Sequence, residues 1–200
     1  MRRLIFIATL LLTMTATIAM ADSIDNRLGL TGRVGAIVPL ATSEIQGKPF
    51  WFSDSGLAAG GGLIYGFGKY FAAEIDISQV PALDVIMESG KVAEANFTDI
   101  SLGIQYRIMP NNRFVPYIGV GGDFIKGYIE NTVLEWTFGG HANVGLDFFI
   151  NKGIALNLDC KGVVARKSDI TENGVKVGSF DPASVITTLG VRLILPEKWW

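Results

Sequence analysis

Hydrophobic and polar residues alternate with a period of two in eight segments of the chain. Alternation of this kind places one set of side chains on each face of a β-strand. The segments are longer than the usual strand of about five or six residues. They match the roughly 9–11 residues that a tilted strand needs to cross a bilayer. The eight segments are residues 29–40, 55–65, 71–79, 97–108, 114–124, 137–150, 154–166 and 184–195.

The connections between these segments alternate between short and long. The short ones contain Gly, Pro or Asn, which suit tight turns, and they are residues 66–70, 109–113 and 151–153. The long polar ones are residues 41–54, 80–96, 125–136 and 167–183. Short turns at one end and long loops at the other are typical of transmembrane barrels. The sequence therefore predicts an all-β fold, namely an eight-stranded antiparallel up-and-down transmembrane β-barrel.

Two kinds of closed barrel fit the alternation, and the polar faces distinguish them. A soluble barrel of the lipocalin type would turn its polar face to water, where about a quarter to a third of the surface should be charged. The polar faces here are instead rich in Gly, Ser, Thr and Asn. Small side chains suit the narrow interior of an eight-stranded barrel. The apolar faces are therefore expected to point into lipid and the polar faces into the lumen.

The few charged side chains on the polar faces are expected to pair with one another. An unpaired charge in the barrel interior would be costly, and the only histidine is expected to join the same polar packing. The predicted lumen network consists of Arg33, Glu74, Asp76, Asp99, Arg107, Asp123, His141, Asp147, Asp159, Lys161 and Arg192.

Aromatic residues gather near the predicted strand ends, as in the two girdles of a membrane barrel. The group toward the long loops is Phe50, Trp51, Phe97, Phe124, Tyr128, Trp136 and Phe138. The group toward the short turns is Tyr65, Phe67, Tyr70, Phe71, Tyr106, Phe114, Phe148 and Phe149. Two long loops are also apolar, at residues 50–52 and 85–87. These loops either cap the barrel mouth, dip into the outer leaflet, or pack among themselves.

The first 21 residues have the pattern of a secretory signal peptide. Arg2 and Arg3 supply the positive start, an apolar stretch follows, and Ala19-Met20-Ala21 matches the cleavage pattern. The sequence thus predicts a signal peptide at residues 1–21 and a barrel domain at residues 22–200.

Composition narrows the class of protein further. Charged residues make up only 18% of the chain, against roughly 25% in average soluble domains. The formal net charge of −2 provides no basic field for nucleic acid. Beyond residue 21 there is no uncharged apolar run of about 18 residues, which a transmembrane helix would need. Helical membrane proteins and nucleic-acid-binding proteins are therefore excluded.

Three stretches carry a resemblance to a known family. They are residues 114–124 (FVPYIGVGGDF), 139–149 (GGHANVGLDFF) and 153–161 (GIALNLDCK). Together with the hairpin pattern, they resemble the small eight-stranded outer-membrane barrels, specifically the OmpW-like branch, and OmpA-like or opacity-type barrels are nearly as similar. The resemblance implies a location in the bacterial outer membrane, in contact with its lipid and lipopolysaccharide. It also implies insertion by the outer-membrane assembly machinery, which reads a terminal aromatic residue such as Trp200.

The resemblance also implies a function. OmpW-like barrels pass small hydrophobic molecules sideways into the membrane, and this is the first expectation for the present chain. The alternative is a structural or surface-interaction barrel with a plugged lumen, whose long loops bind a partner.

Enzymatic and cofactor chemistry is not expected. Some small outer-membrane barrels modify lipids with a His-x-Ser pair, but the residue two positions after His141 is Asn143. His141 and the single cysteine, Cys160, have no metal-ligand spacing between them, and Cys160 is expected to serve in packing. The sequence therefore predicts no catalytic residue, no cofactor and no metal.

Overall fold

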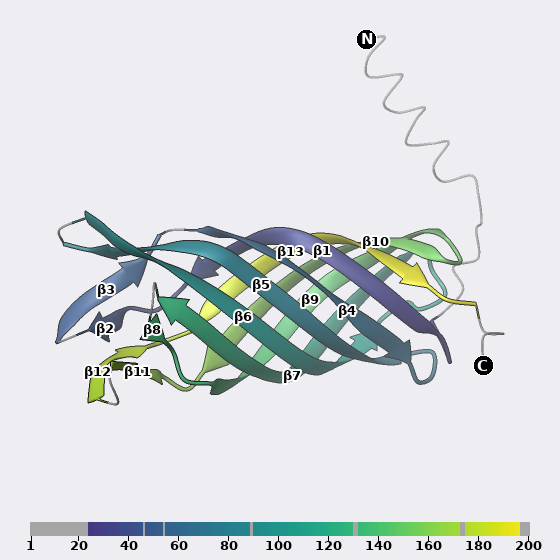
Figure 1. Cartoon of the computed structure of the whole chain (residues 1–200). Helices are drawn as coiled ribbons and strands as arrows, with labels where there is room; N and C mark the ends of the chain where they lie inside the picture. Colours follow the sequence, from purple (N-terminus) through teal and green to yellow (C-terminus); the bar gives the residue numbers. More distant parts are fainter. Residues whose placement is uncertain are drawn as a thin grey trace, which may run out of the picture.

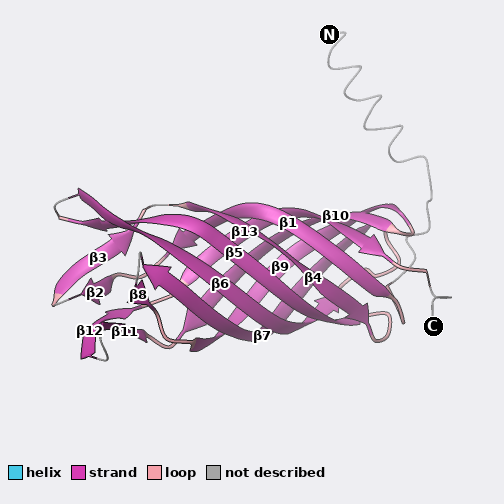
Figure 2. Ribbon diagram, in the orientation of Figure 1, coloured by secondary structure: helices cyan, strands magenta, loops and turns pink. Residues whose placement is uncertain are grey.

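A computed structural model describes residues 24–45, 47–53, 55–88, 90–129, 132–172 and 175–196. Figures 1 and 2 show these residues as an elongated barrel built from strands and loops. No helix among them is long and apolar enough to cross a membrane. The strands are β1 Leu28–Pro39, β2 Ser43–Ile45, β3 Lys48–Phe52, β4 Gly56–Gly66, β5 Phe71–Met87, β6 Gly90–Arg107, β7 Phe114–Ile129, β8 Thr132–Val133, β9 Thr137–Asn151, β10 Ile154–Ala165, β11 Ser168–Glu172, β12 Val175–Phe180 and β13 Ser184–Ile194.

Eight of these strands form one closed antiparallel ring. Each pairs with the next in the order β1, β4, β5, β6, β7, β9, β10 and β13, and β13 pairs again with β1. Tight turns join β4 to β5, β6 to β7 and β9 to β10 at one end, which we call the turn end, and we call the opposite end the loop end. The prediction of an eight-stranded up-and-down barrel is confirmed.

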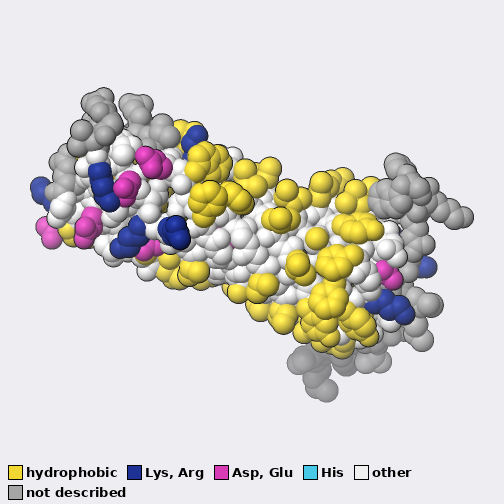
Figure 3. Space-filling model, turned by 90° about the horizontal axis from the view of Figure 1, so that it is seen from below, with side chains coloured by type: hydrophobic (Ala, Val, Ile, Leu, Met, Phe, Trp, Pro, Cys, Tyr) yellow, Lys and Arg dark blue, Asp and Glu magenta, His cyan; other side chains and the backbone are white. Residues whose placement is uncertain are grey.

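The two faces of the barrel wall have the predicted orientation. On β6, the Leu102 side chain points outward and is 60% exposed, whereas the neighbouring Ser101 is buried on the inner face. On β10, Leu156 and Leu158 are exposed, while Asn157 and Asp159 are buried. Figure 3 shows the resulting apolar surface on one face of the barrel wall. The exterior is thus suited to hydrocarbon rather than to water.

The segment 80–96, expected to be a loop, is mostly strand. Both β5 and β6 continue toward the loop end and meet at a tight turn near Glu88 and Gly90. Along the way, Pro81 and Ala82 together oppose the single residue Asn96, because the pairing shifts between Val80 and Leu83. A bulge of this kind accommodates a proline, which has no N–H to give to the ladder. The polar and proline-containing sequence concealed this extension.

The other long loops extend the barrel wall instead of hanging free. Strands β3, β2, β12 and β11 pair in that order as a continuation of β5. On the other side, β8 pairs with β7, and a bridge between Leu134 and Ile170 brings β8 next to β11. We call these five short strands, with the loop ends of β5, β6 and β7, the collar.

An apolar cluster fills the collar. Its aromatic centre is formed by Phe52, Phe97 and Phe180, with ring centroids between 4.9 and 5.6 Å apart. Phe50 packs edge-on against Phe52. Phe50 and Phe97, two of the seven aromatic residues expected in the girdle toward the long loops, are buried, so that part of the girdle prediction is wrong. The apolar loop residues cap the mouth of the barrel by packing on one another.

A second apolar cluster closes the turn end. It joins Ile24, ahead of β1, with side chains from six barrel strands: Ile64, Ala72, Val115, Phe149, Ala155 and Ile194. Phe149 is therefore internal, and the prediction that it belongs to the aromatic group toward the short turns is wrong. Arg27 fastens this end by donating hydrogen bonds from its guanidinium to the backbone oxygens of Leu195 and Lys152, both at 2.9 Å. The predicted signal peptide lies outside the described residues.

Candidate functional site

The middle of the lumen is occupied by a buried arginine on the last strand. Arg192 donates from Nη1 to Asp147 at 2.7 Å and from Nη2 to Glu74 at 2.9 Å. Its Nε donates to Thr31 Oγ1 at 3.0 Å. The side chains of Arg192 and Asp147 are fully buried. Thr31 is the register partner of Arg192 on the neighbouring strand β1, whereas Asp147 on β9 and Glu74 on β5 are not on strands that pair with β13. The two ion pairs therefore run across the bore.

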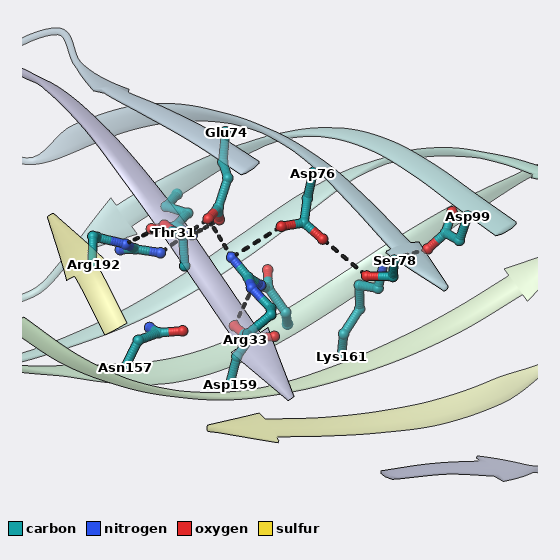
Figure 4. A network of polar contacts seen from close by, with 12 residues as sticks. Thr31, Arg33, Glu74, Asp76, Ser78, Asp99, Asn157, Asp159, Lys161 and Arg192 are labelled. Carbon is teal, nitrogen blue, oxygen red and sulfur yellow. Dashed lines mark hydrogen bonds and ion pairs between the residues drawn. The ribbon is translucent and has the colours of Figure 1, made fainter. Parts of the chain in front are cut away.

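Two further arginines complete this central group. Arg107 donates to Asp147 Oδ2 at 2.6 Å. Arg33 lies between two carboxylates, 2.5 Å from Glu74 and 3.3 Å from Asp76, as Figure 4 shows. Charge-assisted hydrogen bonds of this type are stronger than neutral ones, and each carboxylate here offsets the cost of burying a guanidinium.

The acids nearer the loop end are grouped around Lys161. Its Nζ lies 2.5 Å from Asp99 and 3.4 Å from Asp123. Asp123 also lies 2.9 Å from His141 Nδ1. Ser78, whose register partner on β6 is Asp99, donates to Asp76 Oδ1 at 2.9 Å, so this group lies next to the central one. Figure 4 shows Asp76, Ser78 and Asp99 following one another along the lumen.

Asp159 differs from the other acids because its described partners are neutral. The Tyr117 hydroxyl donates to Asp159 Oδ2 at 2.6 Å, and Asn143 donates to the same oxygen at 2.8 Å. Asn157 donates to the Tyr117 oxygen at 2.9 Å and to Asp147 at 2.8 Å. Gln105 similarly donates to Glu74.

The sequence analysis did not select these neutral members of the network. Tyr117 shares its strand face with Asp123, at positions of equal parity, and this parity would have placed its hydroxyl inside the barrel. Asn143, Asn157 and Gln105 likewise share faces with charged residues that were selected. The pattern that identifies the charged members therefore also identifies their hydrogen-bonding partners.

All eleven residues of the predicted network lie inside the barrel, and each has a polar partner there. Six are carboxylates and four are Arg or Lys, with His141 as the eleventh. No group of three or more His, Cys, Asp and Glu in the described part of the chain is arranged to hold a metal ion. The arrangement fills the bore with cross-strand ion pairs.

Glycine makes room for these large side chains. A Cβ atom at Gly145 would lie 2.2 Å from Cζ of Tyr117, inside the van der Waals limit. The Tyr117 ring thus occupies the space that any other residue at position 145 would need. This explains why glycine appears on the polar faces of strands that otherwise carry long charged residues.

An apolar pocket lies directly above the polar network, inside the collar. It has a cavity volume of about 40 Å³, well above the roughly 10–15 Å³ that one water needs. Asp99 and Ser78 contribute to its lining, together with a larger apolar set. That apolar lining includes Ile37, Phe52, Val80, Leu83, Phe97, Ile125, Val163, Phe180 and Ile186.

The family of the chain follows from its sequence. A model of the outer membrane protein beta-barrel domain matches residues 6–181. The chain belongs to this family. Its closed eight-stranded barrel and apolar outer wall agree with a location in the bacterial outer membrane, where the proteins of this family are found. No curated protein matches the sequence significantly.

Solved structures with the same fold include three small outer-membrane proteins. OprG from Pseudomonas aeruginosa superposes with a TM-score of 0.67 at 16% identity, covering 87% of this chain and 99% of OprG. AlkL in lipid bilayers gives 0.62 at 16% identity, with 90% and 95% covered. Neisserial surface protein A gives 0.59 at 12% identity, with 84% and 97% covered. At these identities the likeness concerns the fold alone.

Proposed function

We propose that this outer-membrane barrel takes up small hydrophobic solutes in the collar pocket and releases them sideways into the membrane. The observation that carries the proposal is the position of the apolar pocket directly above a lumen filled with ion pairs. A solute that enters from the loop end meets apolar side chains first. An apolar molecule gains free energy by leaving water for such a pocket, but not by entering the charged bore beneath it.

An axial route is disfavoured by two barriers in series. Arg192, Asp147 and Glu74 join opposite walls in the middle of the bore. The cluster around Ile24 and Phe149 then closes the turn end. To pass, a solute would have to separate buried ion pairs, and breaking such a pair costs about 3–5 kcal/mol.

A lateral route has a structural basis in β5. Its pairing with β4 ends at Gln79, and its pairing with β3 begins at Val85. In between, Val80 and Leu83 face the pocket, whereas Pro81 and Ala82 face outward and form the bulge against β6. Residues 80–84 of β5 therefore have no strand pairing with the described residues of β4 or β3 between pocket and lipid.

Filling the pocket tests the proposal. Val163 lines the pocket and is 2% exposed, while the adjacent Val164 points outward and is 69% exposed. Val163→Trp should slow the entry of N-phenyl-1-naphthylamine into vesicles by about tenfold or more, equivalent to about 1.4 kcal/mol. Val164→Trp is the matched control and should leave entry almost unchanged. Equal rates for the two variants would overturn the pocket's role.

Repairing the bulge tests the lateral exit separately. Deleting Ala82 and replacing Pro81 with valine restores one-to-one pairing with β6 while keeping Leu83 opposite Ala95. Probe binding in the pocket, read as fluorescence of the dye, should persist, while transfer into lipid should slow. Transfer at the normal rate would exclude an exit through the bulge between β5 and β6. A steady ion current through the purified protein in planar bilayers would contradict the closed lumen.

The second candidate is a surface-interaction barrel. The observation that favours it is the collar, whose strands β2, β3, β11 and β12 extend the barrel beyond the apolar wall (Figure 1). The pocket experiments separate the two functions, because loop recognition would not depend on the free volume beside Val163.

A further inference from the structure

A small group of outward-facing side chains lies at the loop-end border of the apolar wall. Lys126 is on β7, Trp136 immediately precedes β9, and Arg166 immediately follows β10. Lys126 Nζ is 5.5 Å from the centroid of the Trp136 ring. The backbone N–H of Arg166 donates to the carbonyl oxygen of Phe138 at 3.1 Å, which places the Arg166 backbone beside β9. We call Lys126, Trp136 and Arg166 the rim cluster.

The level of the rim cluster relative to the membrane is set by the residues below it. Phe124 and Phe138 pair across β7 and β9, with ring centroids 4.9 Å apart, and both are about half exposed. Val164 is exposed beside them on β10. These apolar residues belong in hydrocarbon, and two positions nearer the loop end the chain reaches Lys126, Trp136 and Arg166. The rim cluster is therefore at the depth of the lipid headgroups, where Trp is also favoured.

Two other cations of the collar have carboxylate partners. Lys91 is paired with Asp84 and Glu94, and Lys176 is paired with Asp169. No described carboxylate lies within ion-pair distance of Lys126 or Arg166. Figure 3 shows charged side chains at the loop end, beyond the apolar wall. Lys126 and Arg166 thus have no neutralising anion among the carboxylates that the structure describes.

We propose that the rim cluster binds a phosphate group of lipid A, the phosphorylated glycolipid of the outer leaflet. Arg166 offers a guanidinium fork and Lys126 a compact ammonium, the two side chains that proteins use for phosphate. Trp136 lies at the same level and covers the sugar or the first part of an acyl chain. The acyl chains then lie along the outward faces of Phe124, Phe138 and Val164. This lipid contact is separate from the solute route through β5, which is on another part of the wall.

The test measures lipid A binding to the full-length barrel in phosphatidylcholine nanodiscs by native mass spectrometry. Each basic residue near an anionic membrane surface contributes about fivefold to binding. Lys126→Gln combined with Arg166→Gln should therefore weaken binding of bisphosphorylated lipid A by about twenty-five-fold. The control variant, Lys91→Gln with Lys176→Gln, removes the same amount of charge from the collar. It should weaken lipid A binding by less than about threefold. Each single rim variant should weaken lipid A binding by about fivefold. Heat-modifiable migration on gels verifies that every variant is folded.

Three results would overturn the proposal. The first is an equal loss of affinity in the rim and control variants, which would indicate a general charge effect. The second is equal binding of bisphosphorylated lipid A and its fully dephosphorylated form. The third is displacement of lipid A by millimolar inorganic phosphate, which would make free phosphate the ligand. The proposal is supported if binding depends on the phosphate groups of lipid A, is lost in the rim variant and is retained in the control variant.

Discussion

Asp147 Oδ2 lies 2.7 Å from Arg192 Nη1, although the two residues are on β9 and β13, with β10 between them. The same oxygen also accepts from Arg107 at 2.6 Å. Asp147→Asn would leave two buried guanidinium groups short of a counter-charge. We expect it to lower the free energy of unfolding by about 3–5 kcal/mol, measured by urea titration in lipid vesicles. Asp169→Asn, which breaks an exposed pair with Lys176, serves as the control and should have little effect.

The hydroxyl of Tyr117 is a second testable part of the network. Tyr117→Phe would remove a donor to Asp159 and an acceptor for Asn157. A loss of about 1–3 kcal/mol in unfolding free energy is expected, because buried polar groups are left unsatisfied. Tyr106→Phe removes a hydroxyl from the exposed outer face and should be nearly neutral. Equal effects of the two variants would contradict the assigned hydrogen bonds.

The close approach of Tyr117 to Gly145 leads to a prediction about assembly. Gly145→Ala places a methyl group 2.2 Å from the tyrosine ring, so the variant should reduce the fraction of barrel that resists unfolding on unheated gels. Gly162→Ala is the matched control, since its nearest neighbour would be 3.9 Å away. Normal folding of Gly145→Ala would show that the interior has more free space than the structure indicates.

Lys91, in the collar, provides a prediction about pH. Hydrogen bonds to Asp84 and Glu94 favour its charged ammonium and raise the pKa of Lys91 from 10.5 to about 12. The stabilisation from this group is therefore complete below pH 10.5 and disappears as the pH rises through about 12. Asp84→Asn should move the pKa back toward 10.5, as an NMR titration of the lysine side chain would reveal. An unchanged pKa in this variant would remove Asp84 as the cause.

The barrel itself was predictable because lipid and lumen impose opposite demands on adjacent residues. On β10, Asn157 and Asp159 alternate with Leu156 and Leu158, and a period of two fixes which set faces lipid. No such constraint acts beyond the membrane. In the collar both faces of a strand can meet protein or water, so β2, β3, β11 and β12 carry no clear alternation. Pro81 then disguised the continuation of β5.

The contacts in the lumen were likewise predictable only in part. Strand parity alone indicates that Asp147 and Arg192 face the interior, but it does not show which acid meets which base. Partner choice depends on the stagger between strands: β10 separates β9 from β13, yet Asp147 still reaches Arg192. The pocket was not predictable either, since Phe52, Phe97 and Phe180 meet only after the loops have folded over the barrel.

The place of β13 in the ring has a consequence for biogenesis. This strand pairs with both β1 and β10, and it is the final barrel strand to leave the ribosome. Until it docks, two sheet edges stay open, and Glu74 and Asp147 lack the guanidinium of Arg192. The strand that joins the two ends of the sheet is thus also the one that neutralises its centre, so a chain truncated before residue 184 would have neither a sealed wall nor an electrically balanced interior.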